Sequence, residues 1–170
     1  GLLVDPVDTV AGHLSRQGYE TATIGKLHFT PHGARGDERN MEYGGYWSDK
    51  GFPVDWSGPY WGFDHVELLC GQCAPVAHYG EWFKANGGTP EMLVKQRLES
   101  DPKCSVMKMP LELHPCAFIA ERSIDFMKQA KDKGKPFFAV ASFQDPHAPY
   151  NPPESVAEKY KPEDVVMPVG

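Results

Sequence analysis

A lysine and a histidine two residues apart, Lys26 and His28, are the pair of side chains whose types and spacing most directly suggest chemistry. They stand at the end of residues 20–26, a run that is typical of a β-strand. On an extended segment, side chains two residues apart point to the same side. Both can therefore contact one anion, the lysine as a point charge and the histidine as a hydrogen-bond donor or acceptor.

A second polar group follows an apolar run much further along the chain. Residues 137–143 are apolar and bounded by turn signals, which predicts a buried strand. The next segment, 144–153, contains four prolines, which fix φ and remove backbone donors, so it is predicted to be a stiff loop. It presents Asp145 and His147 just past the strand. Because ligands of open α/β sheets bind at the carboxyl ends of strands, we expect both strand ends to serve one site.

The two motifs, in this order, resemble a known family. The run GYETATIGKLHF at 18–29 is followed by HPCAFIAERSIDFM at 114–127 and by KPFFAVASFQDPHAPYNPP at 135–153. This series is similar to the type I sulfatases of the alkaline phosphatase superfamily. The resemblance implies an α/β fold, part of an alkaline-phosphatase-like mixed sheet flanked by helices that this chain leaves incomplete. It also implies that residues 1–170 are an interior part of one catalytic domain.

The resemblance assigns a role to each polar residue at the strand ends. It implies hydrolysis of a sulfate ester, of a small molecule or a carbohydrate, with Lys26 binding the sulfate and the oxygen of the nucleophile. It assigns His28 to the hydroxyl of the nucleophile, and His147 to the sulfate or the bridging oxygen. A histidine suits proton donation there because its ordinary pKa is close to neutrality. Asp145 is expected to bind substrate or to orient Lys26.

The same resemblance places the remaining machinery outside this chain. The sulfatase nucleophile is a formylglycine made from the Cys or Ser of a Cys-x-Pro-Ser-Arg signature, and we expect it upstream of Gly1. The ligands of the divalent metal, Ca²⁺ by analogy, are expected upstream and downstream, so no metal ligand is predicted here. Cys73 and Pro75 match only the first and third positions of that signature. We therefore do not expect Cys73 to be the nucleophile.

The spacing of Cys70 and Cys73 is compatible with more than one role. A C-x-x-C pair is found in zinc sites and in redox motifs. A structural zinc site needs four ligands, and no second pair at a suitable spacing is present. A redox role needs a thiol pKa lowered at a helix N-terminus, and Pro75 makes that arrangement a poor fit. Unpaired thiols are the favoured interpretation. The residues available to complete a zinc site are His65, His78, Cys104 and His114.

Composition narrows the possible partners. The net charge of −6 argues against nonspecific nucleic-acid binding, which requires a basic surface. A local Lys/His cluster can still attract a small anion to an acidic protein. No apolar run is long enough to span a membrane, so no membrane partner is expected.

Glycines and prolines interleaved with aromatics at 29–61 predict a long functional loop that forms a wall of the substrate pocket.

Helical and extended patterns alternate along the chain, which favours an α/β sheet flanked by helices. The first helix is expected to be capped by Asp8 and to face inward through Val10 and Leu14. Helices are predicted at 5–18, 77–85, 90–98, 111–133 and 155–160, and strands at 20–26, 62–68 and 137–143.

Two further functions are compatible with these residues. A phosphonate or phosphodiester hydrolase would use the same cations around a phosphoryl centre. A noncatalytic binding or structural fragment would keep the fold without the chemistry.

Residues 21–24 and 137–143 both look like internal strands, which need two neighbours. In this chain we expect one or both to lie at an edge, or to be completed by another copy in a homo-oligomer.

Overall fold

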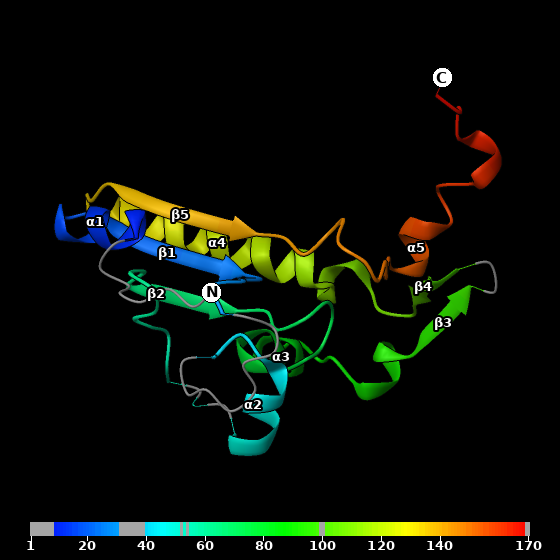
Figure 1. The fold of residues 1–170 in the computed structure, drawn as a ribbon, viewed down its shortest axis with the longest axis horizontal. Helices are drawn as coiled ribbons and strands as arrows, with labels where there is room; N and C mark the ends of the chain where they lie inside the picture. The colour runs from blue at the N-terminus through cyan, green and yellow to red at the C-terminus, as the bar shows by residue number, and fades with distance from the viewer. Residues whose placement is uncertain (1–8, 31–39, 52, 54, 99–100, 169–170) are drawn as a thin grey trace.

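A parallel sheet of three strands forms the centre of the structure, a computed structural model that describes residues 9–30, 40–51, 53, 55–98 and 101–168. The strand order is β2–β1–β5, with β1 at Glu20–Gly25, β2 at His65–Leu68 and β5 at Phe137–Ser142. The three arrows run in the same direction in Figure 1. Their carboxyl ends therefore meet at one edge of the sheet.

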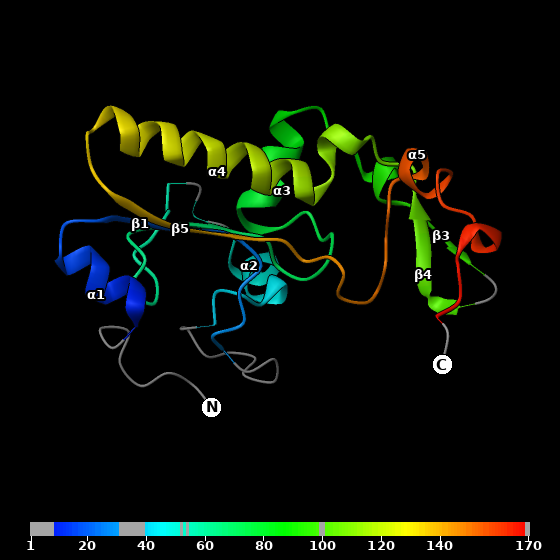
Figure 2. The ribbon, with the colours of Figure 1, turned by 90° about the horizontal axis from the view of Figure 1, so that it is seen from above.

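Helices cover both faces of this sheet (Figure 2). On one face lie α3, Ala77–Ala85, and α4, Pro115–Asp132. On the other face lie α1, Val10–Arg16, and α2, Gly44–Lys50. This three-layer arrangement confirms the predicted α/β class.

Strand β1 is buried on both faces, as the middle strand of a parallel sheet must be. Ala22 and Ile24 are fully buried in the core that also contains Phe118 of α4. Thr21, whose side chain points to the other face, donates from Oγ1 to Asp64 Oδ2 over 2.9 Å. Alternate residues of β1 therefore pack on opposite faces of the sheet, the apolar residues on one face and the threonines on the other.

The end of β1 approaches β5 so closely that only glycine fits. Gly25 has φ of +112°, and a Cβ atom there would lie 2.1 Å from the carbonyl oxygen of Ser142. The next residue, Lys26, donates its backbone N–H to that same oxygen over 2.9 Å. Lys26 is therefore held directly beside the start of the proline-rich loop at 143–153.

A separate antiparallel pair, β3 at Lys95–Leu98 and β4 at Asp101–Met107, supports that loop. Backbone N–H groups of Ser105 and Met107 donate to the carbonyls of Tyr150 and Pro152 over 2.9 and 3.0 Å. The proline-rich loop is thus hydrogen-bonded along β4 as well as to the sheet.

Two predicted helices differ from the structure in the middle of the chain. The helix predicted at 90–98 was wrong, because only Pro90–Leu93 forms a 3₁₀ turn and β3 follows it. Pairing of β3 with β4 outweighs local helix propensity there, and β4 itself was not predicted. The helix predicted at 111–133 is divided: a 3₁₀ turn at Leu111–Leu113 precedes α4.

The ends of the chain and the long loop also need correction. Thr9 caps α1, its Oγ1 accepting from Gly12 N over 3.0 Å, whereas Asp8 lies outside the described residues. Val10 is 63% exposed, so it does not face inward. The last helix, α5, spans Glu154–Ala157 rather than 155–160. The predicted loop at 29–61 contains α2, and parts of it lie outside the described residues.

Strand β5 occupies an edge of the sheet among the described strands, while β1 is paired on both sides. Phe137 and Phe143, at its two ends, are 42% and 46% exposed. One of the two strands expected to be internal is therefore edge-like, as predicted. The prediction that a second copy of the chain completes the sheet in a homo-oligomer stays a prediction. None of the described helices is both long and apolar enough to cross a membrane.

Replacing Gly25 with alanine tests the close contact between β1 and β5. We expect Gly25→Ala to lower the free energy of unfolding by about 3 kcal/mol or more, because it adds a steric clash to the backbone strain. Gly18→Ala is the matched control: Gly18 also has positive φ, +87°, but nothing lies within 4 Å of its Cβ position. That variant should lose about 1–2 kcal/mol. Urea denaturation measures both, and equal losses would contradict the clash.

Candidate active site

The carboxyl edge of the sheet opens into a cleft that receives side chains from both predicted motifs. Two adjoining hollows of about 570 and 580 Å³ share Lys26, Leu27, His28 and His147 in their walls. We call them together the strand-end cleft. Lys26 and His28 follow β1, and His147 follows β5, so neighbouring parallel strands bring them together. The structure thus gathers the three predicted residues in one place.

Lys26 places a positive charge in the strand-end cleft. The side chain is half-buried, and no carboxylate among the described residues lies within ion-pair distance of its Nζ. The lysines 133 and 135, at the opposite end of the sheet, both pair with Glu20 instead, over 2.9 and 2.7 Å. A half-buried ammonium without a counter-ion among the described residues favours an anionic ligand.

The ring of His28 is oriented by a backbone carbonyl. Its Nδ1 lies 3.1 Å from the carbonyl oxygen of Thr30. A carbonyl only accepts hydrogen bonds, so Nδ1 carries a proton and, in the neutral ring, Nε2 is left as the acceptor. Thr30 is held in turn by Asn40, whose Oδ1 accepts from Thr30 Oγ1 over 2.7 Å, and both residues are buried. His28 can therefore take a proton at Nε2.

The ring of His147 is held at the same atom by two partners. Its Nδ1 contacts the carbonyl oxygen of Ala148 and lies 2.8 Å from Gln72 Nε2. The same amide nitrogen of Gln72 donates to the Ala148 carbonyl over 3.0 Å. The amide nitrogen of Gln72 only donates, so Nδ1 is the acceptor and, in the neutral ring, Nε2 carries the proton and is available to a bound substrate.

The segment at 29–61 contributes much of one wall of the cleft. Glu42 is the ionisable group there, and its Oε1 accepts from Phe29 N over 3.0 Å and from Tyr60 OH over 3.1 Å. Burial raises the pKa of the Glu42 carboxyl, and the hydrogen bonds partly offset this effect. The described residues of this segment that line the hollow of about 570 Å³ are Thr30, Asn40, Glu42, Tyr43, Gly44 and Gly45.

The C-x-x-C pair takes part neither in a disulfide nor in an activated thiol. Cys70 and Cys73 are free and buried, and burial raises their thiol pKa values to about 12 and 11. One of the residues available to complete a zinc site, His78, already accepts from Leu68 N and contacts the Trp56 carbonyl, over 2.9 and 2.8 Å. Unpaired thiols, the favoured interpretation, agree with this structure.

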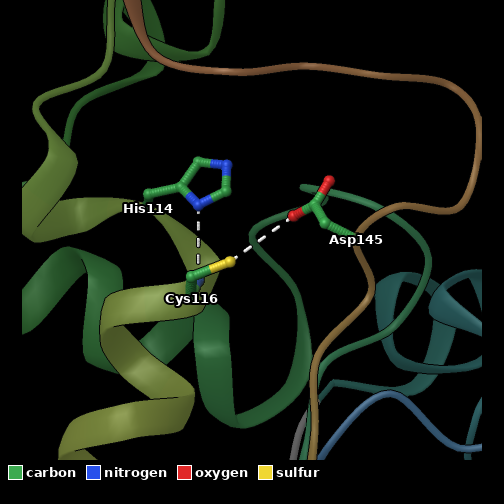
Figure 3. A group of neighbouring side chains, drawn as sticks. All are labelled: His114, Cys116 and Asp145. Atoms are coloured by element: carbon green, nitrogen blue, oxygen red, sulfur yellow. Dashed lines mark hydrogen bonds between the residues drawn. The ribbon is translucent and has the colours of Figure 1, made fainter. Parts of the chain in front are cut away.

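Another group of potential metal ligands lies at the start of α4 (Figure 3). One ligand atom from each of His114, Cys116 and Asp145 lies within 4.8 Å of the other two. Calcium takes several oxygen ligands, so a set of nitrogen, sulfur and oxygen does not fit it. This group therefore does not fit calcium, and no catalytic step is assigned to calcium.

Comparison with known proteins identifies the family. The sulfatase family model matches residues 3–165, which is nearly the whole chain. The chain therefore belongs to the sulfatase family, in agreement with the resemblance carried by its two strand-end motifs.

Two curated relatives agree with this assignment. An arylsulfatase of Clostridium perfringens (strain 13 / Type A) is 29% identical over 95% of this chain and 31% of its own length. The uncharacterized sulfatase YidJ of Escherichia coli (strain K12) is 27% identical over 69% of this chain and 25% of its own length. The chain spans less than a third of the length of either relative.

The sequence did not reveal Gln72. The cysteines on either side of it favour a metal or redox interpretation of this segment. The glutamine between them contacts His147, 75 positions later. A glutamine in a short turn carries no local signal of such a contact. Only the fold shows that the turn after β2 lies beside the loop after β5.

Proposed function

We propose that the full-length protein hydrolyses sulfate esters and that the strand-end cleft of this chain binds the sulfate. The observation that supports this most directly is the ammonium of Lys26, half-buried in the cleft without an ion-pair partner among the described residues. Membership of the sulfatase family supports the same reaction. Sulfate-ester cleavage requires positive charge around the tetrahedral centre and a proton for the leaving oxygen.

Lys26 is proposed to bind the sulfate and to stabilise the charge that accumulates on its oxygens during cleavage. A fixed cation in a partly dehydrated cleft is effective because it needs little reorganisation as the charge develops. The attacking oxygen would be supplied by a formylglycine located outside this chain. The residues of this chain would bind and orient the sulfate ester and exchange protons with the reacting groups.

His28 and His147 are proposed to divide the proton transfers between them. The neutral ring of His28, protonated at Nδ1 toward Thr30, can accept a proton at Nε2 from the hydroxyl of the nucleophile. The Gln72 amide nitrogen only donates, so His147 Nδ1 accepts from it and, in the neutral ring, Nε2 carries the proton that can pass to the leaving oxygen. The predicted substrate contact of Asp145 stays a prediction: its carboxylate lines the cleft but also accepts from Cys116.

The reaction is tested by comparing ester classes on the full-length protein. An aryl sulfate such as 4-nitrocatechol sulfate is the appropriate first substrate, because one of the curated relatives is an arylsulfatase. We expect it to be hydrolysed faster than an aryl phosphodiester or an aryl phosphonate with the same leaving group. Faster cleavage of a phosphorus ester would instead favour the related phosphodiester or phosphonate hydrolases.

We predict that Lys26→Ala lowers the kcat for aryl sulfate hydrolysis by roughly 100-fold or more, the usual order for the loss of an electrostatic stabiliser. Lys128→Ala is the control, because Lys128 is an exposed lysine of α4 that lines neither hollow. Steady-state kinetics on both variants measure the effect. Turnover close to wild type in Lys26→Ala would exclude Lys26 from the active site.

Gln72→Ala should lower kcat by roughly 10- to 100-fold with little change in KM, because a misplaced proton donor slows the chemical step. The physical reason is the loss of the amide that holds His147 Nδ1. An exposed glutamine of β3, Gln96, provides the matched control when it is changed to alanine. If Gln72→Ala raised KM and left kcat unchanged, Gln72 would contact substrate rather than position His147.

A further inference from the structure

The group formed by His114, Cys116 and Asp145 joins two parts of the chain that are distant in sequence. His114 caps α4, its Nδ1 accepting from Cys116 N over a long 3.3 Å, while Asp145 belongs to the loop after β5. Cys116 Sγ lies 3.4 Å from Asp145 Oδ2 (Figure 3). Nitrogen, sulfur and carboxylate oxygen atoms therefore converge from two elements, a donor set typical of zinc sites.

The ring of His114 is oriented for this role. Burial lowers the pKa of His114, and a hydrogen bond to the backbone of Asn151 raises it, so the ring donates to that carbonyl. Its Nδ1 lone pair faces the start of α4, where it accepts from Cys116 N over 3.3 Å, and a bound cation would replace that long hydrogen bond. Histidine ligands of metals are commonly held in this way, by a carbonyl at the other ring nitrogen.

A buried amide beside the group provides an independent sign of a ligand. Gln144 is only 3% exposed, and its Nε2 lies 4.0 Å from Cys116 Sγ. Its Oε1 is buried and has no hydrogen-bond partner in the structure. A buried amide oxygen without a partner is costly, and rotation of the amide would direct that oxygen to Cys116.

We propose that His114, Cys116 and Asp145 bind one zinc-like divalent cation, with Gln144 Oε1 or a water as the fourth ligand. A thiolate and a carboxylate balance the two positive charges, and the N-terminus of α4 favours these anionic donors. The exposed Asp145 gives the cation a route from solvent. Zinc bonds of about 2.0–2.3 Å require the three donors to draw together by roughly 1 Å.

Binding of the cation exchanges a proton for the metal. Without a metal, the Cys116 thiol donates its S–H proton to Asp145 Oδ2 over 3.4 Å. Formation of the metal–sulfur bond breaks the S–H bond and releases that proton to solvent. The cation would then fasten the loop that contains His147, two residues after Asp145, to the start of α4. Its role is structural.

Cobalt binding to the full-length protein tests the site without any use of sulfatase activity. Co²⁺ serves as the spectroscopic substitute for zinc, and excess Ca²⁺ is present to occupy oxygen-rich sites. We expect one equivalent to bind with a thiolate-to-cobalt charge-transfer band in the near ultraviolet, to release one proton and to be displaced by Zn²⁺. Absence of the thiolate band from the wild-type protein would overturn the proposal, whether or not the protein hydrolyses sulfate esters.

Two serine variants locate the thiolate. Cys116→Ser should abolish the band and weaken Co²⁺ binding by roughly 100-fold, whereas Cys104→Ser, the control on β4, should bind as the wild type does. Persistence of the band in Cys116→Ser would contradict the assignment. X-ray absorption of the zinc-loaded wild-type protein gives an answer that does not depend on a variant folding. One sulfur ligand among nitrogen and oxygen ligands supports the site, and two or more sulfurs exclude it.

Discussion

The arrangement of the cleft depends on the contact between β1 and β5 at their carboxyl ends. At Gly25 the two backbones are so close that a side chain of any size would meet the carbonyl oxygen of Ser142. That oxygen also accepts the backbone N–H of Lys26. The contact therefore fixes the position of Lys26 relative to the loop after β5. Because the strands are parallel and adjacent, two motifs more than 100 residues apart open into the same cleft.

Hydrogen bonds at Nδ1 orient both histidines of the cleft and place their protons differently. Nδ1 of His28 donates to Thr30 O, which leaves Nε2 as an acceptor, whereas Nδ1 of His147 accepts from Gln72 Nε2, which leaves Nε2 as a donor. Lys26 beside them supplies a local positive charge on a chain whose net charge is −6. A small dianion such as a sulfate monoester is attracted by such a local field even when the whole protein is acidic.

The sequence was sufficient to predict the elements that carry the two motifs. Strands β1 and β5 lie within one residue of their predicted limits, and α3 matches its prediction, because their apolar patterns are local and strong. The pairing of β3 with β4 was missed because contacts between the two strands of a hairpin stabilise it, and the propensity of each residue does not record such contacts. Gln72 was missed for the same reason, since its contact with His147 exists only in the fold.

The most direct test of the account is a crystal structure of the full-length protein with bound sulfate. The central claim is that Lys26 and His147 contact one anion at the carboxyl edge of the sheet. We expect the ammonium of Lys26 and Nε2 of His147 to lie within about 3 Å of oxygens of the same sulfate. A sulfate bound elsewhere, with Lys26 paired to a carboxylate and directed away from the cleft, would contradict the account.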